Sequence, residues 1–277
     1  MIGFWRGLLS TFSGLAFPLG NWWCSKLSHL KNESRRTEGL IIILPGVEGR
    51  SSLNVNIAKG LADSGLPYAI EILDWTTGLW PLFLYHLRAF GRAKRKAKEI
   101  AARIQQYLVD FPDKPVFLIG QSGGAAEAVL VLESLPMQYA ISGAILLGPA
   151  MSPAYDLTNA LKKTEQGIWN FHSPFDLLIL TLGTTLFGTL DGRHSVSAGA
   201  WGFSCPRDLT LEQRDLYKHQ LHQVRYDPRM IASWHAGGHF GWANRLFVAD
   251  WLAPILAHAA NLSHGHGCQS PQLAKYC

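Results

Sequence analysis

Short apolar runs, separated by longer stretches of mixed polarity, dominate the hydrophobic pattern of this chain. The runs are bounded by Gly, Pro, Asp or Ser, and they show little alternation between polar and apolar residues. Continuous apolar runs of this length are typical of strands that are buried on both faces of a parallel sheet. The expected strands are residues 39–44, 68–75, 116–120, 141–148, 167–172 and 228–234.

The stretches between these runs favour helices, with apolar residues recurring at helical spacing. The expected helices are residues 53–64, 88–109, 125–135, 157–163, 211–224 and 242–260. Alternating strands and helices without internal repeats predict an α/β fold, a doubly wound and mostly parallel sheet with helices on both faces. A chain of 277 residues without a break in composition fits one large domain of this kind, expected over residues 39–262.

A serine lies at the sharpest predicted turn, in Gly120-Gln-Ser122-Gly-Gly124, between an expected strand and an expected helix. Lifting the Ser122 hydroxyl clear of the backbone requires a strained φ/ψ pair at the serine. Side chains two residues on either side would collide with the strand and the helix, which explains Gly120 and Gly124. The following helix also directs amide N–H groups toward any negative charge that forms at the turn. The motif therefore predicts a nucleophilic serine whose hydroxyl stands clear of the backbone, with an ordinary strand-to-helix turn as the alternative.

A serine hydroxyl is a poor nucleophile at neutral pH, so it needs a general base and a group that orients the base. Asp176 and His239 follow expected strands, as Ser122 does, and chemistry in doubly wound sheets gathers beyond the carboxyl ends of the strands. The three side chains are therefore expected to converge.

Other residues compete for two of these roles. Asp156 and Asp191 are rival acids, and His235 is a rival base. The two glycines before His239 suit a loop that turns the imidazole back toward the serine, which favours His239 over His235.

The order Ser122, Asp176, His239, together with the strand–turn–helix around the serine, resembles the α/β-hydrolase family over residues 39–260. The resemblance implies that Ser122 is the nucleophile, His239 the general base and Asp176 the orienting acid. It also implies that the backbone N–H groups of Val47 and Gly123 form the oxyanion hole. Because only 38 residues precede the first expected strand, the sheet is expected to be shortened at its N-terminus.

Three further segments lie outside the expected core. Residues 1–38 are an apolar segment and a polar linker, and residues 1–23 fit a secretory signal, a lipoprotein signal ending at Cys24, an interfacial membrane helix or a helix packed on the domain. We favour membrane contact. Residues 181–225 are expected to be an insertion that serves as a lid or a partner surface, and residues 263–277 a flexible tail.

Composition and charge limit the kinds of partner and cofactor that we expect. The chain is 48% hydrophobic and 16% charged, with a formal net charge of +5. Much of that charge falls on the expected helix 88–109, and without a nucleic-acid motif beside it we interpret the basic residues as a solvated helix face. The four cysteines show no metal-ligand spacing, so neither a metal nor a cofactor is expected. Abundant aromatic residues near 75–85 and 201–203 suggest an apolar pocket.

These observations predict a serine hydrolase that cleaves a small-molecule carboxylic ester with an apolar acyl group through an acyl-enzyme. An acyltransferase, a thioesterase or a peptidase would use the same triad, and the fold does not choose among them. The alternative from another class is a non-catalytic, hydrolase-like protein that binds a ligand or a partner at a membrane. The sequence leaves the location open between cytoplasm and membrane, with secretion not excluded.

Overall fold

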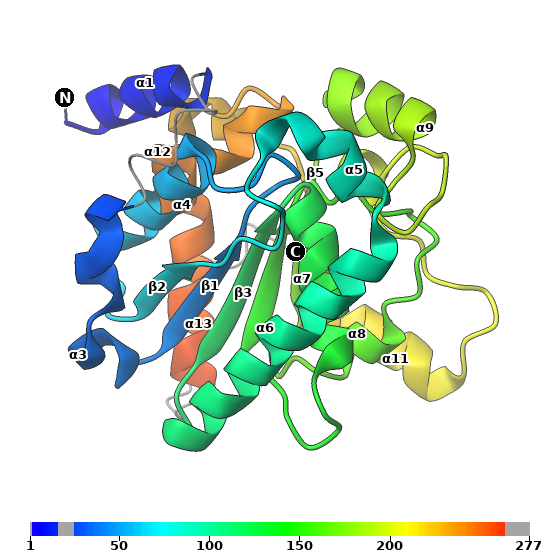
Figure 1. The fold of residues 1–277 in the computed structure, drawn as a ribbon, viewed down its shortest axis with the longest axis horizontal. Helices are drawn as coiled ribbons and strands as arrows, with labels where there is room; N and C mark the ends of the chain where they lie inside the picture. Colours follow the sequence, from blue (N-terminus) through cyan, green and yellow to red (C-terminus); the bar gives the residue numbers. More distant parts are fainter. Residues whose placement is uncertain (1, 16–24, 264–277) are drawn as a thin grey trace.

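The computed structural model describes residues 2–15 and 25–263, and these residues form a parallel sheet wrapped by helices (Figure 1). The six-stranded sheet has the order β2-β1-β3-β4-β5-β6, and every neighbouring pair is parallel. Its strands are β1 Leu40–Leu44, β2 Ala69–Ile72, β3 Val116–Gln121, β4 Gly143–Leu147, β5 Ile168–His172 and β6 Leu221–Arg225. The prediction of a doubly wound parallel sheet is therefore confirmed.

Alternate residues of the central strands pack into two separate cores, one on each face of the sheet. Ile42 and Leu44 pack into the core under α6 Phe90–Asp110 and α7 Gly123–Ser134, whereas Ile41 and Ile43 face the opposite core. Helix α4 Ser52–Asp63 and the helices that end the chain cover this second face. Those last helices are α12 Arg245–Phe247, η7 Val248–Leu252 and α13 Ala253–Ser263. Figure 1 shows α6 in front of the sheet and α13 behind it.

The prediction that residues 228–234 form the last strand is wrong. Residues 228–234 contain the 3₁₀ helix η5 Pro228–Ser233, which starts at a proline and is capped by the Asp227 side chain. The sixth strand is β6, which overlaps the end of the expected helix 211–224. As an edge strand β6 buries only Val224 among polar neighbours, so it lacks the continuous apolar run that marks the inner strands.

Four helical elements lie between β5 and β6, and β6 itself occupies the end of the segment 181–225 expected to be an insertion. These elements are η4 Leu177–Gly183, α9 Thr184–Phe187, α10 Ala198–Trp201 and α11 Leu211–Gln220. The aromatic-rich segment near residues 75–85 leads into two short helices, η3 Trp80–Leu82 and α5 Phe83–Arg88. Short helices η2 Ser25–Lys31, α3 Glu33–Arg36 and α8 Thr158–Leu161 complete the layers, with η6 His239–Ala243 near the chain's end.

The N-terminal helix α1 Ile2–Leu15 packs on the domain beside α4 and α12 (Figure 1). The Asn244 side chain donates hydrogen bonds to the Gly7 carbonyl and the Thr11 hydroxyl, and the Arg245 N–H donates to the Ser10 hydroxyl. None of the helices formed by the described residues combines the length and the apolar character that a membrane span requires. Cys24 and all but the first residue of the expected tail lie outside the described residues.

Candidate active site

Ser122 forms the turn between β3 and α7 with φ 55° and ψ −118°, a conformation that non-glycine residues rarely adopt. A side chain on Gly124 would collide with the carbonyl oxygens of Leu44 and Pro45, and one on Gly120 would collide with the backbone of Gly124. Both glycines are therefore required by the close approach of strand, turn and helix, as the sequence predicted. Backbone strain of this kind costs about 1–3 kcal/mol and is retained where it serves a function.

Asp176 and His239 lie side by side, although 63 residues separate them in sequence. Asp176 follows β5 and caps η4, where its Oδ1 accepts a hydrogen bond from the Leu180 N–H at 3.3 Å. Its Oδ2 lies 2.6 Å from Nδ1 of His239, and both side chains are buried. Because a carboxylate only accepts, Nδ1 of His239 carries the proton, and in the neutral ring Nε2 keeps a lone pair. The structure thus brings together the predicted acid and base.

The environment of His239 favours its protonated form. Burial alone would lower the pKa of the imidazole, but the charge of Asp176 and the hydrogen bond to it act in the opposite direction. The carboxylate of Glu48, in the loop after β1, adds to this effect, and together they raise the pKa of His239 above its ordinary value. A buried imidazole whose positive charge is stabilised in this way is suited to accept a proton from a nucleophile.

Val47 and Gly123 are neighbours, as the predicted oxyanion hole requires. The Val47 amide nitrogen lies 3.5 Å from the position that a Cβ on Gly123 would occupy. Two residues hold the loop that carries Val47. The Trp75 indole N–H donates to the Pro45 carbonyl at 2.7 Å, and Nδ1 of His86 lies 2.7 Å from the Val47 carbonyl oxygen.

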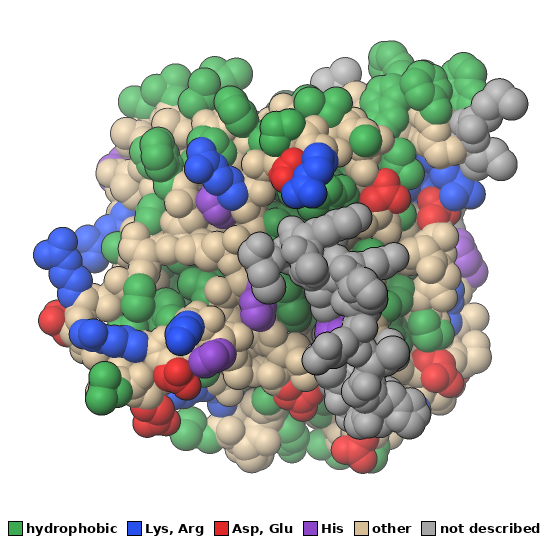
Figure 2. All heavy atoms as spheres, turned by 180° about the vertical axis from the view of Figure 1, so that it is seen from behind, with side chains coloured by type: hydrophobic (Ala, Val, Ile, Leu, Met, Phe, Trp, Pro, Cys, Tyr) green, Lys and Arg blue, Asp and Glu red, His purple; other side chains and the backbone are tan. Residues whose placement is uncertain are grey.

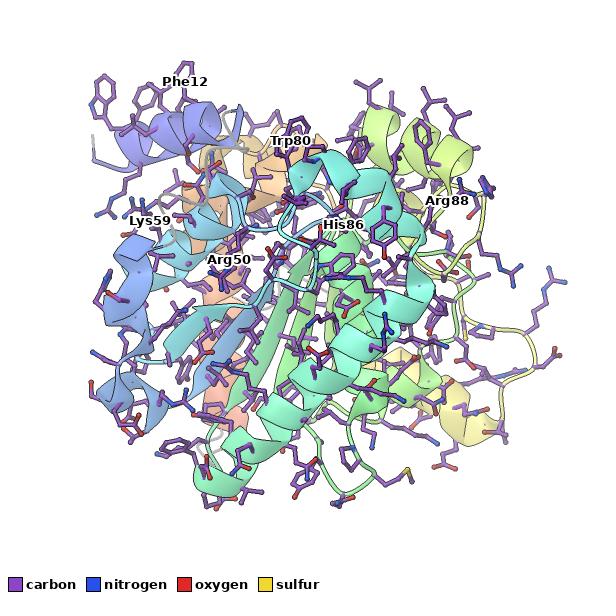
Figure 3. The ribbon with its side chains drawn as sticks, in the orientation of Figure 1. Phe12, Arg50, Lys59, Trp80, His86 and Arg88 are labelled. Atoms are coloured by element: carbon purple, nitrogen blue, oxygen red, sulfur yellow. The ribbon has the colours of Figure 1, made fainter. Side chains whose placement is uncertain are left out.

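Sequence reasoning missed His86 (labelled in Figure 3), whose ring links the Val47 loop to the segment before α5. Since a carbonyl oxygen only accepts, Nδ1 donates to it, and Nε2 accepts from the Thr77 N–H at 3.1 Å. Burial lowers the pKa of His86, which keeps the ring neutral as this arrangement needs. No motif or spacing marks His86 in the sequence, because its partners are backbone groups that only the fold brings near. Trp75, expected in a pocket wall, likewise supports the loop.

The rival residues have other surroundings. Asp156 accepts hydrogen bonds from the backbone and side chain of Thr158 and from the Tyr217 hydroxyl, so it stabilises the start of α8. Asp191 accepts from the Ser152 N–H at 2.9 Å. His235 is fully buried among aromatic rings, with its ring centroid 3.9 Å from that of Trp242. These residues serve packing and turns rather than the site.

A cavity of about 240 Å³ lies beside His239, and its walls come from α1, α4 and the His239 loop. Ser10 and Thr11 of α1, Leu53 of α4, and Trp234 and Phe240 contribute to its lining. Among the described residues, the His239 ring hydrogen-bonds Asp176, and no hydrogen bond joins it to the Ser122 hydroxyl. No group of described His, Cys, Asp and Glu side chains is placed to hold a metal ion.

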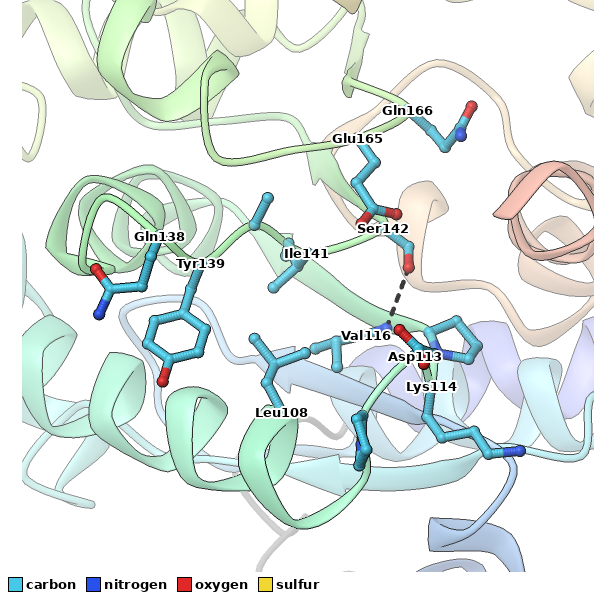
Figure 4. A pocket seen from close by; sticks show the side chains of 13 residues that line it. Leu108, Asp113, Lys114, Val116, Gln138, Tyr139, Ile141, Ser142, Glu165 and Gln166 are labelled. Atoms are coloured by element: carbon cyan, nitrogen blue, oxygen red, sulfur yellow. Dashed lines mark hydrogen bonds between the residues drawn. The ribbon is translucent and has the colours of Figure 1, made fainter. Parts of the chain in front are cut away.

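A larger cavity, of about 610 Å³, lies at the other end of the sheet, where β3 and β4 begin (Figure 4). Ser142, Glu165 and Gln166 line it, and the Val116 N–H donates to the Ser142 hydroxyl at 3.3 Å. Ligands of doubly wound sheets bind beyond the carboxyl ends of the strands, so this amino-end cavity does not compete with the Asp176–His239 region as a site.

The parallel sheet, the strand–Ser122–helix turn and the acid–histidine pair beyond the strand ends are those of the α/β-hydrolase fold. Solved structures similar to this chain are distant in sequence. A dienelactone hydrolase-like promiscuous phosphotriesterase from metagenomic libraries is 13% identical, covers 80% of this chain and 86% of its own, and has a TM-score of 0.46. Esterase B from Lactobacillus rhamnosis is 14% identical over 89% of this chain and 81% of its own, with a TM-score of 0.46.

A cutinase-like protein from Cryptococcus sp. is 16% identical over 86% of this chain and 100% of its own, with a TM-score of 0.39. No protein-family model and no curated protein sequence matches the chain. Likeness at this distance does not assign a reaction, so the function must be argued from the residues of the site.

Proposed function

We propose that this protein is a serine hydrolase that cleaves a carboxylic ester through an acyl-enzyme. The observation that carries the proposal is the buried Asp176–His239 pair. The pair lies beyond the carboxyl end of the sheet, where Ser122 forms its strained turn. An imidazole oriented by a carboxylate is the base that a serine hydroxyl needs, and chain order and topology place the serine at the same end of the sheet.

In the proposed reaction, the Ser122 oxygen attacks the ester carbonyl carbon while its proton passes to Nε2 of His239. The carbonyl oxygen becomes an oxyanion, which accepts hydrogen bonds from the backbone N–H groups of Val47 and Gly123. When the tetrahedral intermediate collapses, the bond to the alcohol oxygen breaks and His239 gives its proton to that oxygen. Water then repeats the sequence on the acyl-enzyme, releases the acid and restores the serine hydroxyl.

Asp176 holds the ring in the Nδ1–H tautomer and stabilises the imidazolium during each transfer. The cavity beside His239 has Leu53, Trp234 and Phe240 in its lining and would suit an apolar group on the substrate, although Ser122 is not among the residues that line it. Thioesters, amides and acyl transfer to another alcohol would use the same groups, so the carboxylic ester is the proposal and these are its variants.

A non-catalytic protein that binds a ligand is the second candidate. It is favoured by one observation: among the described residues, no hydrogen bond joins the His239 ring to the Ser122 hydroxyl. Catalytic hydrogen bonds are often long or poorly aligned without substrate and tighten in the reacting complex, so this observation does not outweigh the acid–histidine pair.

Labelling by a fluorophosphonate probe tests the proposal. We expect the wild-type protein to be labelled, Ser122→Ala to be unlabelled and His239→Ala to react far more slowly, whereas His235→Leu should be labelled like the wild type. Hydrolysis of p-nitrophenyl esters of increasing chain length would then measure the acyl preference. A folded wild-type protein that neither reacts with the probe nor hydrolyses any ester would support the binding protein instead.

A further inference from the structure

Helix α1 packs on the domain through its small residues and turns its large apolar residues outward. Gly7 lies against the Trp234 ring, Gly14 against Leu53, and Ser10 is buried. The outward side chains are Phe4, Trp5, Leu9 and Phe12, which are 56–66% exposed. A surface helix of a globular protein normally directs its apolar stripe toward the core, so this helix has the reverse arrangement.

Two other segments expose large apolar side chains at the same end of the molecule. In η3 and α5 and the residue before them these are Leu79, Trp80, Leu82, Phe83 and Tyr85, each at least 41% exposed. In η4 and α9 they are Leu177, Leu178, Leu182, Leu186 and Phe187, each at least 44% exposed. We call these two segments and α1 the apolar rim.

The three parts of the rim surround the carboxyl end of the sheet. Figure 1 shows α1, α5 and α9 at the upper end of the molecule, where the strands finish, and Figure 3 labels Phe12 and Trp80 there. Seen from behind, hydrophobic side chains gather at both upper corners of the surface (Figure 2). At the other end of the sheet, exposed apolar side chains such as Val109 and Met137 occur singly. Clustered apolar exposure of this size marks an interaction surface, whereas single residues need no explanation.

We propose that the apolar rim docks on an anionic lipid surface, with the carboxyl end of the sheet, which carries Ser122, Asp176 and His239, turned toward the lipid. The hydrophobic side chains gather at separate corners of the surface (Figure 2), so a fluid surface that adapts to each corner fits them better than a folded partner does. Trp5 and Tyr85 are residues that favour the boundary between lipid and water.

The charges of the rim also suit anionic lipid. The rim helices α1, η3, α5, η4 and α9 contain no Asp or Glu. Helix α5 ends with exposed Arg88, and Arg6 of α1 is partly exposed and forms an ion pair at 3.6 Å with Asp63 of α4. Basic residues next to apolar ones strengthen binding to a negatively charged membrane surface. The inference rests on the proposed function for the reaction at Ser122. Given that function, the substrate class is esters held in or at a lipid surface. The docking itself does not need catalysis.

Vesicle sedimentation tests the docking. Ser122→Ala protein, which performs no chemistry in the proposed mechanism, is mixed with vesicles of phosphatidylcholine alone or with phosphatidylglycerol. We expect sedimentation with the vesicles, stronger when phosphatidylglycerol is present. Adding Leu9→Asp and Phe12→Asp, or Leu178→Asp and Leu182→Asp, should weaken lipid binding by about tenfold or more, because each pair places two charges in the lipid boundary.

The matched control adds Val109→Asp and Met137→Asp, two exposed apolar residues at the other end of the sheet. This control should bind vesicles within about twofold of its parent, since its charges stay in water. Circular dichroism and thermal melting confirm that every variant is folded, and a second rim pair replaces any that is not. Absence of vesicle binding by the parent, or equal loss in the control, would overturn the inference.

Two further readouts distinguish lipid docking from self-association and from catalysis. Light scattering without lipid measures the oligomeric state, and a dimer that the rim variants dissociate would show that a second copy covers the rim, which overturns lipid docking. Fluorophosphonate labelling of rim variants that keep the wild-type Ser122 measures the reactivity of the serine without lipid. Vesicle binding without labelling would leave docking standing and reject the hydrolase, and labelling without vesicle binding would do the opposite.

Discussion

His235 and His239 are four residues apart in one short segment and are both buried, yet their chemistry differs. The rings of Tyr226, Trp242 and Phe247 surround His235, neither of its ring nitrogens has a partner among the described residues, and burial lowers its pKa to about 3. His239 instead pairs with Asp176, which reverses the effect of burial on its pKa. Asp176 acts on both rings, but only the direct hydrogen bond and close charge at His239 outweigh burial, so the pKa of His239 is raised and that of His235 is lowered.

The largest expected effect is on catalytic activity, and it should distinguish variants of His239 from variants of His235. Replacing the general base of such a triad lowers kcat by about 10⁶-fold, so His239→Gln should remove almost all esterase activity. His235→Leu should keep kcat/KM within about threefold of the wild type, because His235 touches only packing partners. Initial rates with a p-nitrophenyl ester measure both. Equal losses in the two variants would break the distinction between the rings.

Removing the charge of Asp176 should make His239 more like His235. Asp176→Asn leaves the side-chain volume unchanged but favours the wrong tautomer, and such a change lowers kcat by about 10⁴-fold. The raised pKa of His239 should fall with it. Since the base must be neutral, the rate falls as the pH drops through this pKa, and the residual activity of Asp176→Asn should persist to lower pH than that of the wild type.

The pH–rate profile of both proteins is the measurement for this prediction, with Asp191→Asn as the control because its carboxylate stabilises a turn elsewhere. Coincident profiles for the wild type and Asp176→Asn would show that Asp176 does not set the pKa of His239.

A third buried histidine sharpens the comparison, because His86 is kept neutral by burial but still has partners. His86→Phe preserves a ring and removes its hydrogen bond to the Val47 carbonyl, which loosens the loop of the oxyanion hole. Misplacing such a group by about 1 Å costs up to about 100-fold in rate, so kcat should fall by about 10- to 100-fold with little change in KM. Steady-state kinetics check the split.

Exposed Met137→Ala is the control for this variant, with thermal melting to confirm folding. An unchanged kcat in folded His86→Phe protein would mean that the loop needs no support from this ring.

The smallest effect concerns stability. His235 has a pKa of about 3 in the folded protein and about 6.5 when unfolded. As the pH falls from 6.5 toward 3, only the unfolded state takes up a proton, so the free energy of unfolding falls by about 1.4 kcal/mol per pH unit. His235→Leu should flatten this dependence between pH 7 and pH 5, and urea unfolding at both values measures it. An unaltered slope in His235→Leu would refute the assignment.

The sequence alone determined the sheet, the turn and the triad candidates. Buried parallel strands require apolar residues on both faces, so the runs that became β1, β3 and β4 were visible in the chain. The glycines around Ser122 were equally visible, because strand, turn and helix meet there too closely for side chains. By contrast, β6 is an edge strand made mostly of polar residues. The apolar residues near 230, which form a 3₁₀ helix, resembled a strand more closely than the residues of β6 do.

Only the tertiary structure decided which acid and which histidine meet. Its place after an expected strand favoured Asp176 over Asp156 and Asp191, but only the fold shows that Asp176 contacts His239, 63 residues away. The same holds for His86, whose partners are backbone groups, and for α1, whose outward apolar face depends on which side packs against α4 and α12. Local patterns determine which segments are buried strands and tight turns, since those depend on near neighbours. Pairing between distant side chains depends on how the segments pack, which no local pattern records.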